Sequence, residues 1–287
     1  MRTRRPGRPG GDGSFRPPDR GGRGSPNTRR ERGAGRPDPA ALTLPVGREA
    51  LYGRNAVFEA LAGRRSLHRL LVAEGVREDD RLRQIEQRAT DRSLTIDRVP
   101  RMQLDDLTRG ANHQGIVVEA GTYPYVDLED IVVRQATVLV LDHVQDPQNL
   151  GTLLRAAEVA GAAGVVIARD RAAEVTPAVV NASAGAVEHL AVAQETNIGR
   201  ALDRLSHRGW WPVGLDTGPD AVDLFTATLP APVALVVGSE GSGLSPVVRK
   251  RCDPIVSLPV RGAVASLNAA TAGAIALFEL IRREMVE

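Results

Sequence analysis

Apolar runs alternate with helically spaced apolar positions along residues 135–287. Runs of Val, Ile and Leu without polar alternation predict strands buried on both faces, as in a parallel sheet. The predicted strands are Val138–Leu141, Gly164–Ala168, Val213–Leu215, Val233–Val237 and Ile255–Leu258. The predicted helices are Leu150–Ala160, Pro177–Val187, Ile198–Arg208, Pro246–Arg251 and Ser266–Arg283. Thr176-Pro177 suits a helix start, and Gly161 suits the position just past a helix end. The pattern predicts a doubly covered parallel sheet.

Residues 48–122 predict a second, smaller α/β unit. Apolar side chains at helical spacing follow Tyr52-Gly53-Arg54-Asn55-Ala56-Val57 and predict a helix there. The segment Asp79–Ala89 predicts a second helix. The predicted strands are Leu70–Ala73, Leu94–Ile96 and Gly115–Ala120. Residues 123–134 are predicted to be a linker.

Residues 1–47 differ from the rest of the chain in composition and charge. They hold 10 Gly and 8 Pro, and 11 Arg against 4 acids, which is a net charge of +7. The remaining residues hold 26 basic and 31 acidic side chains, a net charge of −5. The segment has almost no apolar side chains to bury, and it therefore cannot offset the conformational entropy lost on folding. We expect it to be a disordered tail. It can act as an RNA-directed arm or only as a solubilising tail.

Composition and motifs exclude several classes of protein. Cys252 is the only cysteine, which rules out an intramolecular disulfide and a cysteine zinc site and favours a reducing cytoplasm. The five histidines have no ligand spacing, so we expect no metal. The chain has no apolar run of membrane length and no apolar segment after its first arginines, so we expect neither a span nor a secretory signal. Gly238-Ser239-Glu240-Gly241-Ser242-Gly243 lacks the dinucleotide-binding glycine pattern, and no Walker A sequence is present.

Polar residues gather at the carboxyl ends of three predicted strands. The segments are 141–157, 235–245, and 258–262 together with 265–270. Ligands bind at this edge of parallel sheets, so the three segments together predict a site. Each residue also has a plainer interpretation. Asn149 can be only a helix cap, Arg155 a surface cation, and Glu240 a loop acid. Ser266 and Asn268 can simply begin a helix.

In order, spacing and residue type, the three segments resemble the motifs of the SpoU/TrmH family of RNA 2′-O-ribose methyltransferases, of the SPOUT class. The Tyr52–Val57 segment and Asn112-His113-Gln114-Gly115-Ile116 resemble the substrate-binding domain of RlmB-type members, which is similar to ribosomal protein L30e. The resemblance implies an α/β SPOUT domain with a trefoil knot at 135–287. It also implies an L30e-like RNA-binding domain at 48–122 and a homodimer with its site near the interface.

The resemblance further implies S-adenosylmethionine as cofactor and 23S ribosomal RNA as partner, with a guanosine as the methyl acceptor. It assigns cofactor contacts to Gly238, Leu258 and Leu267. It assigns catalysis to Asn149, Arg155, Glu240, Ser266 and Asn268, with Asn149 and Glu240 orienting Arg155. A guanidinium stays protonated, so Arg155 is better suited to holding a phosphate or stabilising an alkoxide than to acting as a base.

Other functions stay open at this level. Relatives with similar layouts act on adenosine in the same RNA and confer resistance, and others act on tRNA. A non-catalytic RNA-binding factor in ribosome assembly is the alternative from another class, although it has no need for Arg155 and Glu240 together. A dinucleotide-dependent oxidoreductase is disfavoured because the glycine fingerprint is missing.

Overall fold

The computed structural model describes residues 42–264 and 266–285. The tail predicted at 1–47 therefore falls mostly outside the described residues. Its last residues are described, and Leu42 and Leu44 pack against an apolar cluster that includes Leu71 and Leu104. Among the helices of the described part, none is long and apolar enough to cross a bilayer.

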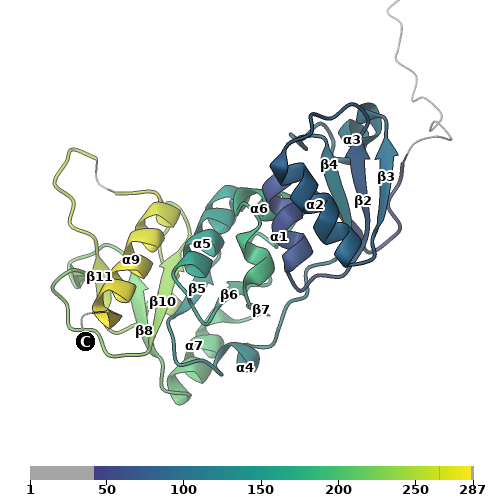
Figure 1. Ribbon diagram of the computed structural model, residues 1–287. Helices are drawn as coiled ribbons and strands as arrows, with labels where there is room; N and C mark the ends of the chain where they lie inside the picture. The colour runs from purple at the N-terminus through teal and green to yellow at the C-terminus, as the bar shows by residue number, and fades with distance from the viewer. Residues whose placement is uncertain (1–41, 265, 286–287) are drawn as a thin grey trace, which may run out of the picture. The chain divides into compact units, whose positions relative to one another are not determined.

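Residues 48–121, here called the front unit, contain a four-stranded mixed sheet in the order β1-β4-β2-β3 (Figure 1). Its elements are β1 (Arg48–Tyr52), α1 (Arg54–Ala62), β2 (Leu67–Ala73), α2 (Asp80–Asp91), β3 (Thr95–Val99), α3 (Arg101–Leu107) and β4 (Ile116–Gly121). The inner strand β4 carries the apolar run Ile116–Val118, and only its last residue is more than slightly exposed. The sequence pattern missed β1 and α3. In β1 only Ala50 and Leu51 are buried, and in α3 only Leu104 is buried, so neither segment shows a long apolar pattern.

The second unit contains a seven-stranded sheet in the order β7-β6-β5-β10-β8-β11-β9. All of its neighbouring strands pair in parallel, so the predicted parallel sheet is confirmed. Its strands are β5 (Val138–Asp142), β6 (Gly164–Ala168), β7 (Val192–Glu195), β8 (Trp211–Leu215), β9 (Val222–Asp223), β10 (Val233–Gly238) and β11 (Ile255–Ser257). Its helices are α4 (Leu128–Ile131), α5 (Pro147–Val159), α6 (Pro177–Ala182), the 3-10 turn η1 (Ala186–His189), α7 (Ile198–His207), α8 (Pro246–Arg249) and α9 (Ala269–Glu284). The segment predicted as a linker contains α4.

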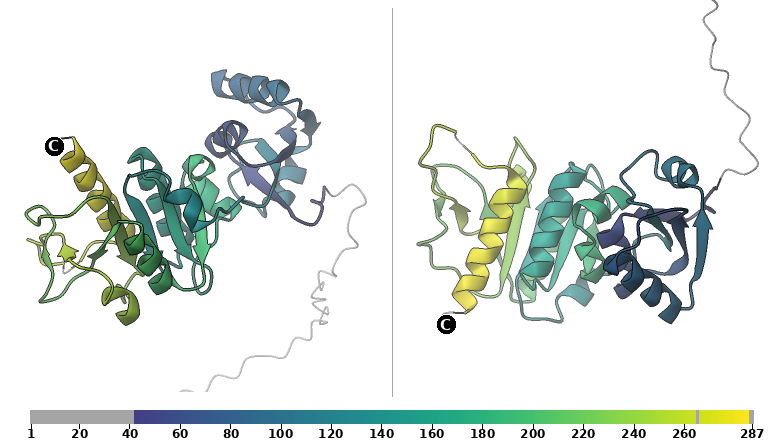
Figure 2. Two further views of the ribbon diagram at one scale, coloured as in Figure 1. Left: turned by 90° about the horizontal axis from the view of Figure 1, so that it is seen from below. Right: turned by 45° about the horizontal axis from the view of Figure 1, so that its top comes forward.

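Helices cover both faces of this sheet. On one face, α5 and α9 lie side by side and pack against Leu139, Leu141 and Leu235 (Figure 2). On the other face, α7 packs against Val138, Val140 and neighbouring side chains. Successive strand residues point to opposite faces, so a continuous apolar run supplies both cores at once.

The helix predicted at Pro177–Val187 is shorter than expected. It ends at Ala182, and Ala184 and Gly185 follow with left-handed φ values of 53° and 88°. Left-handed residues cannot continue a right-handed helix, so the chain turns there and resumes as η1.

A buried ion pair joins the front unit to the second unit. Arg65 follows α1, and its guanidinium lies 3.0 Å from the carboxylate of Glu188 on η1, with both side chains at most 1% exposed. A second guanidinium nitrogen of Arg65 lies 2.6 Å from Glu49. Burial raises the pKa of Glu188, and Arg65 opposes that shift. Tyr123 closes the contact by donating its hydroxyl to the Leu190 carbonyl at 2.8 Å.

Candidate active site

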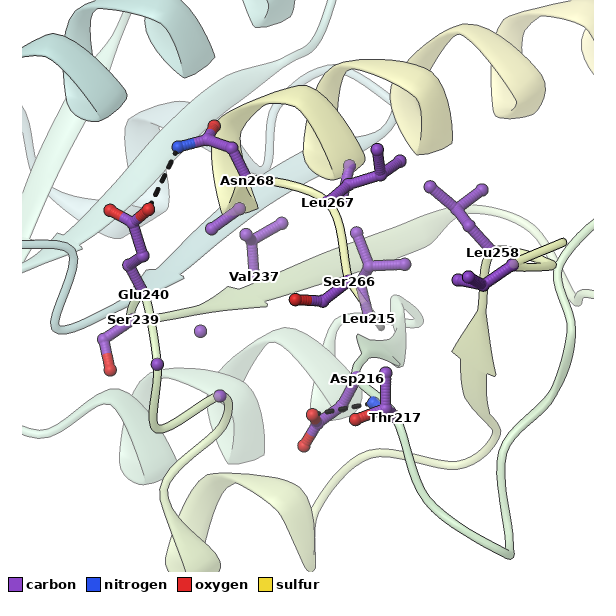
Figure 3. Close-up of a pocket in the computed structure, with 16 residues that line it drawn as sticks. Leu215, Asp216, Thr217, Val237, Ser239, Glu240, Leu258, Ser266, Leu267 and Asn268 are labelled. Carbon is purple, nitrogen blue, oxygen red and sulfur yellow. Dashed lines mark hydrogen bonds between the residues drawn. The ribbon is translucent and has the colours of Figure 1, made fainter. Parts of the chain in front are cut away.

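A cavity of about 520 Å³ lies at the carboxyl ends of β8, β10 and β11 (Figure 3). Its wall consists of the loops after these strands and the segment that enters α9. Of the predicted site residues, it includes Gly238, Glu240, Leu258, Ser266, Leu267 and Asn268. The parallel arrangement brings the three strand ends to one edge, which is why segments far apart in the sequence meet here.

Three polar side chains form a connected cluster beside this cavity. The Asn149 amide nitrogen donates to Glu240 at 2.9 Å. The Asn268 amide nitrogen donates to the Asn149 carbonyl oxygen at 2.9 Å and contacts Glu240 at 3.4 Å. Asn149 is buried, whereas Glu240 and Asn268 are exposed. The cluster therefore joins residues of all three predicted segments and leaves one side open to a ligand.

The interpretation of Asn149 as a helix cap is wrong. The cap of α5 is Asp146, whose carboxylate accepts the Asn149 backbone N–H at 3.0 Å. Pro147 occupies the first helical position, so α5 begins three residues earlier than predicted. With the cap supplied by Asp146, the Asn149 side chain is free to join the polar cluster.

Asn268 serves both of the purposes that the sequence suggested as alternatives. Its side-chain oxygen accepts the backbone N–H groups of Ala270 and Thr271 at 2.9 and 3.1 Å, which caps α9. Its amide nitrogen points the other way, into the polar cluster. Helix α9 thus begins at Ala269 and not at Ser266. Ser266 stays outside the helix, and its hydroxyl points into the cavity (Figure 3).

Arg155 does not join the cluster within one chain. It lies six residues after Asn149 on α5, which corresponds to about 9 Å along the axis and a different face of the helix. The residue is exposed, and its side chain has no hydrogen bond or ion pair with any residue of 42–264 or 266–285. Leu153 and Leu154 are fully buried and anchor this stretch of α5, whereas Val159 is 62% exposed.

Gly238 is required by the loop that follows it. A Cβ placed on Gly238 would lie 2.2 Å from the Gly243 carbonyl carbon and 2.5 Å from the Leu244 nitrogen. The residues between form a tight turn in which Ser239 and Gly243 exchange backbone hydrogen bonds at 3.1 and 3.0 Å. The packing of the chain itself therefore already accounts for a glycine at this position, independently of any contact with a cofactor.

The loop after β8 also contributes to the cavity and was not predicted from the sequence. Asp216 and Thr217 line the cavity and directly follow the predicted strand Val213–Leu215. The rule that picked out the other loops, polar residues at a strand's carboxyl end, applies to them as well. The Asp216 carboxylate accepts the Thr217 N–H at 2.8 Å and pairs with Arg249 at 2.7 Å.

The charged side chains of the cavity wall are Asp216 and Glu240. Apolar side chains, among them Leu215, Val237 and Leu258, provide much of the remaining surface. A cavity of this size with apolar walls and a few polar groups suits a cofactor-sized ligand, and the two carboxylates favour one that carries positive charge.

Two family models match separate stretches of the chain. The SpoU rRNA Methylase family model matches residues 136–278, which contain the cavity and the polar cluster. A model described as RNA 2′-O ribose methyltransferase substrate binding matches residues 50–126.

Curated relatives extend over both stretches. A Bacillus subtilis protein named as a TrmH family tRNA/rRNA methyltransferase is 38% identical over 239 residues, which are 81% of this chain and 95% of the relative. The chain belongs to the SpoU rRNA methylase family. A Synechocystis tRNA/rRNA methyltransferase, named as uncharacterised, is 39% identical over 241 residues, and the match spans 82% of this chain and 62% of that longer protein.

This SpoU-family chain is also similar to solved structures. The SpoU methyltransferase AviRb from Streptomyces viridochromogenes, solved in complex with the cofactor AdoMet, matches with a TM-score of 0.72 and 27% identity. The match covers 84% of this chain and 92% of AviRb. These likenesses agree with the α/β fold expected from the sequence, whereas the trefoil knot and the L30e-like character of the front unit stay predictions.

Proposed function

We propose that this chain transfers the methyl group of S-adenosylmethionine to a ribose 2′-hydroxyl of RNA, with a guanosine of 23S ribosomal RNA as the acceptor. Family membership supports the reaction class, and the substrate-binding model over residues 50–126 supports RNA as the partner. The observation that carries the proposal is the Asn149–Glu240–Asn268 cluster beside a cofactor-sized cavity. The cytoplasm, where ribosomal RNA is modified, is the proposed location.

The cavity fits S-adenosylmethionine in size and in the chemistry of its lining. Leu215, Leu258 and Leu267 would hold the adenine, and the backbone of the Gly238 loop would contact the rest of the cofactor. The carboxylates at the wall complement its positive charge. When bound, S-adenosylmethionine supplies an electrophilic methyl group on a sulfonium, so the protein's task is to position the acceptor and make it nucleophilic.

The polar cluster provides the contacts that an acceptor hydroxyl needs. Two amides hold the Glu240 carboxylate in place, and this carboxylate still has lone pairs that can accept a hydrogen bond from a 2′-hydroxyl. Ser266, with its hydroxyl in the cavity, can hold the neighbouring phosphate or sugar. The residues thus orient a hydroxyl toward the cavity before reaction.

The position of Arg155 points to a second copy of the chain as the missing part of the site. On α5, Arg155 shares an exposed face with Thr152 and Val159 at i, i+3 and i+7 spacing. On the adjacent helix α9, Ile275 and Phe278 are 38% and 48% exposed. Large apolar side chains exposed on two packed helices are typical of a subunit interface. We infer a homodimer through this face, in which Arg155 of one copy serves the acceptor phosphate of the other.

Mixed dimers test this arrangement. Arg155→Ala and Asn149→Ala should each reduce methyl transfer to RNA by at least a hundredfold, with S-adenosylmethionine affinity within about threefold of the wild type. If Arg155 acts across the interface, an equimolar mixture refolded together regains about a quarter of wild-type activity. Half of the dimers are then mixed, and each has one intact site. A mixture as inactive as the two variants measured separately would show that Asn149 and Arg155 act in the site of the same chain.

The acceptor is tested by mapping 2′-O-methyl groups on ribosomal and transfer RNA from cells with and without the protein. The proposal expects a single guanosine of 23S ribosomal RNA to lose its methyl group in the deletion strain. Loss of methylation at an adenosine or in tRNA would correct the target. Unchanged methylation in every RNA, together with no S-adenosylmethionine binding, would favour the non-catalytic alternative.

A further inference from the structure

Two arginines without partners follow β6, at the same edge of the sheet as the cavity. Arg169 and Arg171 are both exposed, and neither side chain has a hydrogen bond or ion pair with a residue that the structure describes. The arginines after β10 differ, because Arg249 pairs with Asp216 and Arg251 pairs with Asp203. The charge of the Arg169–Arg171 turn is therefore available to a ligand.

The strand register places this turn close to the polar cluster. Gly238 of β10 lies beside Asp142 of β5, and Leu141 lies beside Ile167 of β6. Arg169 is therefore two strand spacings, about 10 Å, from the start of the Glu240 loop. Between them lies His143, whose ring nitrogen contacts the buried Asp142 carboxylate at 2.6 Å.

The turn is attached to the scaffold on both sides. The Arg169 N–H donates to the Glu195 carbonyl on β7 at 2.9 Å. The Ala173 N–H donates to the Val144 carbonyl, in the loop after β5, also at 2.9 Å. Arg171 has a left-handed φ of 54°, a conformation that is uncommon for arginine and needs support from its surroundings. A rigid mount of this kind presents the two guanidinium groups in a fixed place.

The turn also lies between the polar cluster and the front unit. It leads directly into α6, where the Asn181 amide donates to the Tyr52 carbonyl of the front unit at 3.1 Å. An RNA held by the front unit, with its acceptor nucleotide at Asn149 and Glu240, would have to pass along this stretch of the edge.

We propose that the Arg169–Arg171 turn binds backbone phosphates of the RNA strand next to the acceptor nucleotide and so positions that nucleotide. This inference rests on the proposed function. Guanidinium groups suit phosphate because their planar fork can donate two hydrogen bonds to it. Asp170 and Glu174 are exposed acids in the same loop, and neither pairs with the two arginines in the described structure. Phosphate contacts of this kind give affinity and register without base preference.

The test compares two double charge reversals in the full chain. R169E/R171E removes the proposed contacts. R134E/R208E makes the same change in net charge at the opposite edge, where Arg134 precedes β5 and Arg208 precedes β8. The probe for binding and turnover is unmodified 23S ribosomal RNA made by in vitro transcription. S-adenosylmethionine affinity and thermal melting are measured on the same preparations.

R169E/R171E should raise the Kd for RNA at least tenfold and leave S-adenosylmethionine affinity within twofold. Losing two phosphate contacts should also make the salt slope shallower by about 1.4, whereas R134E/R208E should keep the wild-type slope. In turnover, KM for RNA should rise more than kcat falls, because the contact is made in both ground and transition states.

Equal losses in the two double variants, or a wild-type Kd and salt slope for R169E/R171E, would overturn the inference. The proposed function fails separately, if the wild-type chain transfers no methyl group to any RNA. The salt slopes still decide the role of the turn in that case, because binding is measured without turnover.

Discussion

At the scale of single residues, the site depends on asparagine side chains whose amide oxygen accepts one hydrogen bond while the amide nitrogen donates another. Asn268 caps α9 with its oxygen and bonds Asn149 with its nitrogen. Asn149 in turn accepts from Asn268 and donates to Glu240. An aspartate at either position has no amide donor, so the chain of bonds that fixes Glu240 needs asparagine.

Gly238 allows a sharp test at this scale. Gly238→Ala adds one methyl group where the backbone of Gly243 and Leu244 leaves no space, so the loop must move. We expect S-adenosylmethionine binding to weaken at least tenfold, about 1.4 kcal/mol, as measured by calorimetric titration. The matched control is Gly262→Ala, because a Cβ there meets nothing within 4 Å. Wild-type affinity in Gly238→Ala would show that the loop does not shape the cofactor site.

At the scale of elements, helix ends determine where α5 and α9 present the functional side chains. Other helices show how far a capping residue can be identified from sequence. Asn197 caps α7 by accepting the Arg200 N–H at 3.0 Å. Thr176 occupies the predicted cap position of α6, but its side chain makes no capping bond.

Asn197→Ala should therefore lower the free energy of unfolding by about 1 kcal/mol. Thr176→Ala, which removes a similar side chain without a capping bond, should lower it by only a few tenths. Urea denaturation of both variants measures the difference. Equal effects would show that the Asn197 hydrogen bond adds nothing to stability.

Helix α9 also carries a carboxylate with a pH-dependent contribution to stability. Hydrogen bonds from Arg282, and then from Arg283, lower the pKa of Glu279 from an ordinary value near 4.5 to about 2. Because folding lowers this pKa, the ionised Glu279 stabilises the folded state at pH values above the unfolded-state pKa. This stabilisation is lost as pH falls toward 2. Between pH 5 and pH 3, urea midpoints should therefore fall more steeply for the wild type than for Glu279→Gln. Parallel pH profiles would contradict this contribution.

At the scale of the whole molecule, buried polar contacts join the front unit to the second unit. Arg65 is enclosed between Glu49 and Glu188, and its guanidinium lies 5.2 Å from the centre of the Tyr123 ring. Removing one partner of a buried pair leaves an uncompensated charge, so this pair favours the geometry in which both charges are satisfied. The contact therefore holds the front unit in register with the parallel sheet of the second unit.

Arg65→Met should destabilise the chain by about 3–5 kcal/mol, because it leaves the Glu188 carboxylate buried without its partner. The double variant Arg65→Met/Glu188→Leu removes both charges and should recover part of that loss. Urea denaturation measures both. If the double variant is less stable than Arg65→Met alone, the unpaired Glu188 carboxylate is not the cause of the loss, and this explanation is wrong.

The sequence by itself determined the parallel sheet and the polar segments after β5, β10 and β11, but not the loop after β8. Strands such as Gly164–Ala168 were predicted at their observed bounds because burial on both faces demands an unbroken apolar run. Glu240, Ser266 and Asn268 were identified because strand ends and motif order are properties of the chain alone. Short elements such as β9 (Val222–Asp223) leave no such pattern and were missed.

Only the tertiary structure decided which of these residues meet. Asn149 bonds Glu240 and Asn268, 91 and 119 residues further along the chain, and no local pattern encodes such pairings. Arg155, close to Asn149 in sequence, points elsewhere because six residues turn a helix to a different face. The order of strands in the sheet, which brings β10 beside β5 and β8, depends on how the two apolar faces pack together. That packing is a property of the whole fold, which is why the geometry of the cavity and of the polar cluster could not be predicted from the sequence.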